Sequence, residues 1–186
     1  METKIELISF IFINKMKLLG HLKTINKHKY YVTKLCFRCG LYKQGIKHDL
    51  SKYSLTELKT GAKYYVGTRS PNSIERETIG YSSAWLHHKG RNKHHWEYWV
   101  DFSMKGTTAA RMPNNYVVEM FCDRVAATMV YRGADFDISA PLEYYNHTHL
   151  YYVMHEQTDE MIKDMLTYLS IHGLDDTIKY IKKTYL

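Results

Sequence analysis

The sequence predicts an all-α protein, built as a single-domain helical bundle over residues 1–186. Apolar side chains recur at helical spacings along most of the chain, which is typical of helices that bury one face. Three prolines and ten glycines are few for this length, so we expect short loops and long helices. Few segments alternate polar and apolar residues with period two, so we expect no substantial sheet.

The clearest predicted helices lie in the second half of the chain. Apolar residues from Tyr116 to Tyr131 follow a helical period, and Pro113 stands just before them, where proline often begins a helix. Two further helices are expected over Asp159–Ile171 and Asp175–Tyr185. Gly173 lies between them and should end the first, because glycine accepts the left-handed backbone of a helix C-terminus.

The first half is predicted as shorter helices with one long loop. We expect a helix over Lys27–Lys43 that Gly45 breaks, then a helical segment over Asp49–Tyr64 and a short helix over Ser82–Leu86. Glycine, proline and asparagine between Val66 and Gly80 favour a surface loop there. The other breaker regions are Met104–Asn115 and Arg132–Pro141.

Bulk properties indicate an intracellular protein with a modest attraction for anions. The apolar run Leu7–Ile13 is far shorter than the roughly 20 residues of a membrane span and lacks a signal-peptide cleavage site, so it is interpreted as a core or packing segment. The three cysteines, an odd number, favour free thiols in the cytoplasm, and Cys36, Cys39 and Cys122 are expected to be packing residues. The net charge of +7 favours phosphate esters or nucleic acid as partners, although surface lysines alone also explain it.

The chemistry-bearing residues are histidines and aspartates. Among the 11 histidines, His48 and Asp49 are adjacent, and two adjacent histidine pairs follow in WLHHKGRNKHHWEYW. Imidazole and carboxylate groups together suit divalent metals. Asp123 stands among apolar residues of the predicted helix, where an uncompensated charge is costly, so we expect the helix to bring it next to His48 and Asp49. Each residue alone could instead be an ordinary hydrogen-bonded side chain, and the paired histidines a surface patch.

The order of these residues resembles the HD-domain superfamily of helical metal-dependent proteins, whose pattern runs H…HD…H…H…D. The resemblance implies a bundle of HD-domain type and a four-ligand core of His28, His48, Asp49 and Asp123. The further histidines between the His48-Asp49 pair and Asp123 imply a second metal. His88 and His95 are chosen as its ligands, with His87 and His94 kept as alternatives, because neighbours on a helix point about 100° apart.

The string HDLSK is similar to HDIGK of the HD-GYP phosphodiesterases, in which the lysine lies close to substrate. Lys52 is by that similarity a phosphate contact, but the GYP signature does not follow in this sequence. The strings HKYYV, HDLSK and HHKGRNKHHWEYW together resemble a small uncharacterised bacterial and phage family, which supplies no substrate.

The resemblance implies a phosphohydrolase that acts on a nucleotide or another phosphate ester through metal-activated water. One or two ions of Mn, Fe, Zn, Ni, Co or Mg would serve as cofactor. Asp49 and Lys52 are the expected catalytic residues, and Lys52, Arg91 and Lys93 the expected substrate contacts.

Two alternatives stay open. HD-type di-iron oxygenases use the same kinds of ligand, and bound iron would distinguish them. A binding module without turnover is the other, because aromatic residues between basic ones can stack nucleic-acid bases. The residues concerned are Trp85, Trp96, Tyr98 and Trp99, near Lys89, Arg91 and Lys93.

Overall fold

The computed structural model describes residues 2–104 and 106–186, with side chains from residue 12 onward. Helices account for 74% of it and strands for 5%, so the predicted all-α class is confirmed. The chain divides into two compact units: unit 1 comprises Met1–Lys27 and Asp49–Arg91, and unit 2 comprises His28–His48 and Asn92–Leu186. The single domain expected over residues 1–186 stays a prediction.

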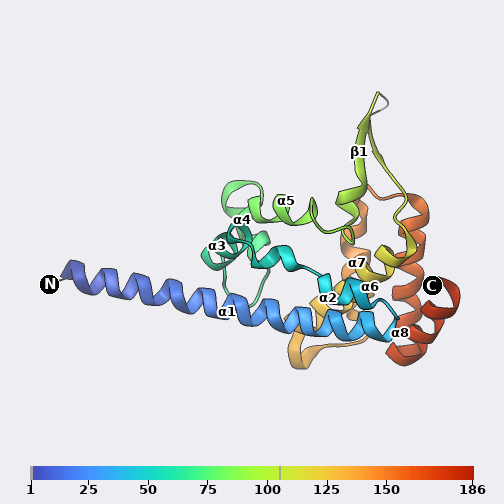
Figure 1. The fold of residues 1–186 in the computed structure, drawn as a ribbon, viewed down its shortest axis with the longest axis horizontal. Helices are drawn as coiled ribbons and strands as arrows, with labels where there is room; N and C mark the ends of the chain where they lie inside the picture. The colour runs from blue at the N-terminus through green and yellow to red at the C-terminus, as the bar shows by residue number, and fades with distance from the viewer. Residues whose placement is uncertain (1, 105) are drawn as a thin grey trace. The chain divides into compact units, whose positions relative to one another are not determined.

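Unit 1 consists of short helices and the first part of a long one. Helix α1 (Glu2–Arg38) belongs to unit 1 as far as Lys27. The other elements of unit 1 are η1 (Leu50–Tyr53), α3 (Leu55–Lys63), α4 (Pro71–Ile79) and α5 (Ser83–Lys89). Helix α3 packs on both α4 and α5, which also contact each other (Figure 1).

Local capping interactions fix the ends of these short helices. The side chain of Ser54 accepts from the backbone N–H of Glu57 and begins α3, and Ser82 accepts from Trp85 and begins α5. The buried carboxylate of Glu75 on α4 accepts hydrogen bonds from the hydroxyls of Ser82 and Ser83 at 2.6 and 2.7 Å. Glu75 therefore joins the middle of α4 to the start of α5.

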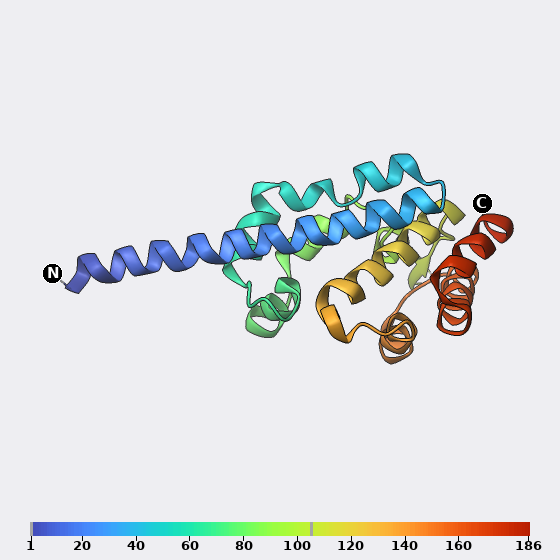
Figure 2. The same ribbon diagram turned by 90° about the horizontal axis from the view of Figure 1, so that it is seen from below.

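Unit 2 contains the rest of α1 and the longer C-terminal helices. Its other elements are α2 (Tyr42–Lys47), η2 (Trp96–Trp99), β1 (Val100–Ser103), β2 (Gly106–Ala109), α6 (Asn114–Arg132), η3 (Gly133–Asp135), α7 (Ala140–Thr148), η4 (His149–Tyr151) and α8 (Glu156–Thr184). The two strands pair antiparallel, with Val100 opposite Ala109. Helices α6, α7 and α8 lie side by side (Figures 1 and 2).

The core of unit 2 forms around α6. Val32 and Leu35 of α1, Phe121 and Val125 of α6, and Leu166 of α8 belong to one cluster of buried side chains. Helix α6 is buried around much of its circumference, as expected for a helix without a polar face. Any carboxylate on the buried part of this helix must therefore be compensated by a partner.

Several predicted boundaries are wrong. Gly45 is buried inside α2, and the break lies instead at Gly40, whose φ of 84° is left-handed. The loop expected over Val66–Gly80 contains α4, which begins at Pro71 because proline suits the first turn of a helix. The helical segment expected over Asp49–Tyr64 is divided at Ser54 into η1 and α3.

The N-terminal apolar run does not belong to the core where its side chains are described. Phe12 and Ile13 are 62% and 53% exposed, and the side chains of residues 7–11 lie outside the described residues. In the described part of the chain, no helix is long and apolar enough to cross a bilayer.

The C-terminal predictions are confirmed. Helix α6 spans Asn114–Arg132, close to the predicted Tyr116–Tyr131. Helix α8 contains a kink at Gly173, which has φ 75° and ψ 176°. The glycine thus separates two helical segments as expected.

We predict that Gly173→Ala lowers the free energy of unfolding by about 1–3 kcal/mol, because this backbone conformation is almost restricted to glycine. Gly90→Ala is the matched control, since Gly90 has an ordinary right-handed backbone with φ −73° and should change stability by less than about 1 kcal/mol. Urea unfolding of both variants measures the difference. Equal effects would show that the kink does not constrain residue 173.

Candidate metal centre

Helix α6 carries two carboxylates on one face. Glu119 and Asp123 are four residues apart, so their side chains lie one above the other. Glu119 is 4% exposed, and the side chain of Asp123 is 17% exposed. Three histidines of unit 2 contact this pair.

Glu119 contacts two of these histidines through one oxygen. Its Oε1 atom lies 2.9 Å from Nδ1 of His48 and 3.2 Å from Nδ1 of His94. The two imidazole rings lie with their centroids 4.3 Å apart. Because each ring is held at Nδ1, the opposite nitrogen, Nε2, is directed away from Glu119.

Asp123 contacts these opposite nitrogens and a third histidine. Its Oδ1 atom lies 2.9 Å from Nε2 of His28 and 3.6 Å from Nε2 of His48, and its Oδ2 atom lies 4.0 Å from Nε2 of His94. The expectation that the helix brings Asp123 close to His48 is therefore met. Three Nε2 atoms converge on one carboxylate.

The histidines and carboxylates of this cluster stabilise one another electrostatically. A neutral imidazole has one N–H, so His48 cannot donate to both Glu119 and Asp123 without a second proton or a cation at one nitrogen. Burial alone raises the pKa of Glu119, but hydrogen bonds from His48 and His94 outweigh it and lower the pKa. Asp123 is partly buried, which alone raises its pKa, yet contacts with His28 and His48 hold that pKa well below the usual value. Both carboxylates are therefore anions at neutral pH.

Each histidine is placed by a different element. His28 lies on α1, and His48 ends α2 as its C-terminal cap. The ammonium group of Lys29 donates to the backbone carbonyls of Ile46 and His48, both at 2.8 Å. Lys29 thereby fixes the end of α2 against α1 and positions His48. His94 lies in the turn before η2.

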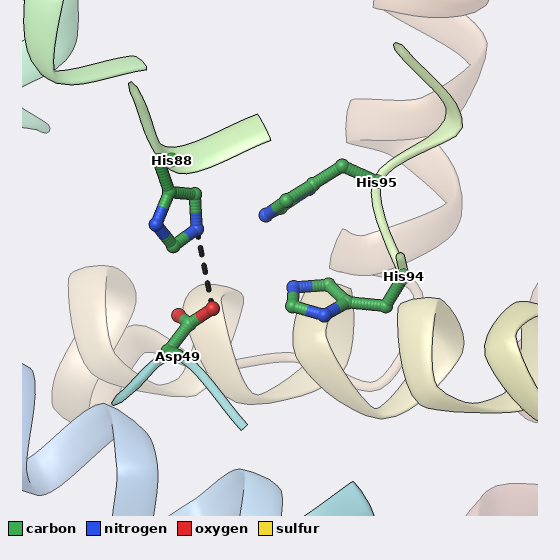
Figure 3. Close-up of side chains that lie close together, drawn as sticks. All are labelled: Asp49, His88, His94 and His95. Atoms are coloured by element: carbon green, nitrogen blue, oxygen red, sulfur yellow. Dashed lines mark ion pairs between the residues drawn. The ribbon is translucent and has the colours of Figure 1, made fainter. Parts of the chain in front are cut away.

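Unit 1 contains a second arrangement of the same kind. The boundary between the units falls between His48 and Asp49, so the two residues are described separately. Asp49 has a left-handed backbone with φ 55°, and its Oδ1 lies 3.2 Å from Nε2 of His88. Nδ1 of His88 lies 2.9 Å from Oε2 of Glu57. Figure 3 shows the Asp49–His88 ion pair.

Two neighbouring histidines of α5 share the carboxylate of Glu57. Nδ1 of His87 lies 2.7 Å from Oε1 of Glu57, while His88 uses Oε2. Burial alone lowers the pKa of His88, but the charge of Asp49 and hydrogen bonds to Asp49 and Glu57 outweigh it and raise the pKa. His88 is the more buried of the two, and it alone contacts Asp49, which favours His88 over His87 as the ligand.

The predicted substrate contacts have partners within the protein. The Lys52 ammonium lies 2.7 Å from Oδ2 of Asp49, and Arg91 donates to the backbone carbonyl of His87 at 3.1 Å. Lys93 is exposed, with its ammonium over the rings of Tyr98 and Tyr116. Their roles toward a substrate stay predictions.

The histidines near η2 do not lie on a helix. His94 and His95 occupy a turn, so the argument that helical neighbours diverge by 100° does not apply to them. Their rings lie 4.1 Å apart, and His94 is the one that contacts Glu119 and Asp123. His94, kept as the alternative to His95 from the sequence, is therefore part of the candidate cluster of unit 2, and the choice of His95 stays a prediction.

Buried histidines and carboxylates of unit 2 could hold a metal ion. The donor atoms of His48, His94 and Glu119 lie within 4.8 Å of one another, and so do those of His28, His48 and Asp123. Nitrogen and carboxylate oxygen suit manganese, iron, cobalt, nickel and zinc. Cys36, Cys39 and Cys122 are buried in the core as expected, and none belongs to a potential metal-binding group of the described residues.

Sequence reasoning missed Glu119, Glu57 and Lys29. The spacing of Glu119 four residues before Asp123 was the available signal, since it places both on one helical face. Glu57 was concealed by the pattern Ser54-x-x-Glu57, which is typical of a helix capping box. The Ser54 half of that motif forms, but the Glu57 carboxylate binds histidines.

Fold and site together define a helical protein whose buried histidine, aspartate and glutamate groups could hold a metal ion. The chain belongs to a family of unknown function (DUF5662), which matches residues 17–168 and thus includes every predicted ligand. Searches of curated proteins and of solved structures gave no match.

We predict that Glu119→Gln weakens metal binding by about 10–100-fold, because a carboxylate behind a ligating histidine fixes its orientation and basicity. Glu143→Gln, on the exposed surface of α7, is the matched control and should bind metal as the parent does. Competition with a chromophoric chelator measures both affinities. Unchanged affinity in Glu119→Gln would exclude an orienting role for Glu119.

Proposed function

We propose that this protein is a metal-dependent phosphohydrolase of HD-domain type. The observation that carries the proposal is the convergence of the Nε2 atoms of His28 and His48 on the Asp123 carboxylate, with His48 held from behind by Glu119. Nitrogen donors with carboxylates behind them are the usual construction of a protein metal site.

In this proposal His28, His48 and Asp123 hold a divalent ion, and His94 is positioned to join them. Asp49, His88 and His95 are proposed as further ligands on the basis of the sequence pattern. A bound metal would supply hydroxide at neutral pH and stabilise the charge on a phosphate ester. The mixed nitrogen and oxygen donors are compatible with one or two ions of Mn, Fe, Zn, Ni, Co or Mg.

The residues of the chain would orient and protect this chemistry. Lys29 and Glu119 fix the backbone and the ring of His48. Lys52, which contacts Asp49, is proposed to neutralise part of the phosphate charge, with Arg91 and Lys93 as further cations. A nucleotide or another small phosphate ester is the proposed substrate.

A nucleic-acid platform is less well supported. Trp96 and Trp99 pack against the core of unit 2, so their rings are partly covered by protein. Trp85 lies against the ring of His88 and the guanidinium of Arg76. Of the predicted platform residues, Tyr98 is exposed, at 38%.

The test is metal analysis of the purified protein, followed by removal of metal with a chelator and separate restoration with Mn, Fe, Co, Ni, Zn and Mg. Each form is assayed against phosphomonoesters, phosphodiesters and nucleotides. We expect hydrolysis that returns with one or more of these metals. Bound iron with a visible absorption band and no hydrolysis would contradict the proposal and favour an oxygenase.

Asp123→Asn should weaken metal binding and abolish most of the hydrolysis, because it removes an anionic donor from the cluster. Added metal should raise the Tm of the parent more than that of the variant, since only the tighter binder is strongly stabilised. Asp101→Asn, on exposed strand β1, is the matched control. Equal Tm shifts for parent and Asp123→Asn would exclude Asp123 as a ligand.

A further inference from the structure

Arg124 follows Asp123 on α6, and its guanidinium lies against two aromatic rings. Its guanidinium carbon lies 5.6 Å from the ring centre of Tyr145 and 5.3 Å from that of Tyr152. Cation–π contacts of this kind use the face of the guanidinium and leave its N–H donors in the plane. The two tyrosines therefore hold the side chain, and of its N–H donors only Nη1 contacts one of them, the Tyr152 hydroxyl.

The charge of Arg124 has no carboxylate partner among the described residues. Its one hydrogen bond to a side chain there is a long one of 3.4 Å to the Tyr152 hydroxyl, and its buried Nε atom has no hydrogen-bond partner. A half-buried cation with unsatisfied donors costs free energy unless an anion compensates it. This combination is typical of a side chain held ready for an anionic ligand.

Contacts within unit 2 connect Arg124 to the metal-binding cluster on two sides. Through the backbone it is the neighbour of Asp123, from which its side chain diverges by about 100° around the helix. Through Tyr152 it reaches Trp96, whose ring centre lies 5.1 Å from that of Tyr152. Trp96 follows His94 and His95 directly. Arg124 is thus the chain neighbour of Asp123 and is linked through Tyr152 and Trp96 to the segment that carries His94, while its own side chain is directed away from that of Asp123.

We propose that Arg124 binds the phosphate group of the substrate and selects phosphomonoesters. This inference rests on the proposed phosphohydrolase function. The planar fork of arginine binds two oxygens of one phosphate. A phosphomonoester has three terminal oxygens, so two can meet Arg124 while the third meets a metal. A phosphodiester has two and cannot do both fully.

Arg124→Gln and Arg124→Lys test the proposal, with Arg76→Gln as the matched control. Arg76 also places its guanidinium over an aromatic ring, with its guanidinium carbon 5.5 Å from the ring centre of Trp85, but it belongs to α4 of unit 1. Calorimetry measures binding of inorganic phosphate to each metal-loaded protein, and elemental analysis checks its metal content. Arg124→Gln should bind phosphate about tenfold or more weakly than the parent, as loss of a charged hydrogen bond predicts. Arg124→Lys, which keeps a cation over the rings, should be intermediate, and Arg76→Gln unchanged.

Kinetics separate this inference from the proposed function. Arg124→Gln should lower kcat/KM for phosphomonoesters more than for phosphodiesters, with metal content unchanged. Parental phosphate affinity in Arg124→Gln, or no phosphate binding by the metal-loaded parent, would overturn the role of Arg124. If Arg124→Gln still hydrolyses phosphate esters and binds phosphate with the parental affinity, Arg124 is structural and the phosphohydrolase proposal stands. If the parent hydrolyses nothing but loses phosphate binding on Arg124→Gln, the anion site stands and the phosphohydrolase proposal fails.

Discussion

The buried carboxylate of Glu119 is the constraint on which the cluster of unit 2 depends. One of its oxygens contacts Nδ1 of both His48 and His94, so two rings from different segments are oriented by one atom. Glu119 lies on a helix that is otherwise buried by apolar contacts, and its position is set by the packing of α6. The core of the unit thus determines where the two Nε2 atoms point.

The same scheme occurs in unit 1. There Glu57 contacts Nδ1 of His88, whose Nε2 atom meets Asp49. In each unit a carboxylate lies on one side of an imidazole and an aspartate on the other. The two carboxylates beside such an imidazole give an excess of negative charge. Protons neutralise this charge at low pH, and a divalent cation neutralises it more completely at neutral pH. If a metal binds as proposed, its affinity would depend on the two glutamates as well as on the ligands themselves.

Much of the helical architecture was predictable because it depends on local periodicity. Helix α6 and the kink at Gly173 follow directly from apolar spacing and from a glycine with a left-handed backbone. Helix α4 was missed because Gly67, Pro71 and Gly80 all signal turns, and Pro71 in fact begins a helix. The exposure of Phe12 could not be predicted, because a local apolar run does not reveal whether another element covers it.

The aspartates of the candidate site could be predicted from the sequence, whereas the glutamate and histidines that contact them were harder to predict. Asp123 was identifiable because a charge among apolar neighbours needs compensation. Glu119 has apolar neighbours too, but its role depends on His48 and His94, which only the tertiary fold brings to it. The choice between His94 and His95 rested on a helical argument that does not apply, because the chain forms a turn there.

X-ray absorption spectroscopy of the protein loaded with one equivalent of zinc tests the central claim most directly. The account predicts a first shell of nitrogen and oxygen at about 2.0–2.2 Å, with the outer-shell scattering of at least two imidazole rings and no sulfur. A sulfur shell at about 2.3 Å would assign the metal to the buried thiols instead. That result, or a shell without histidine, would contradict the site built on His28, His48 and Asp123.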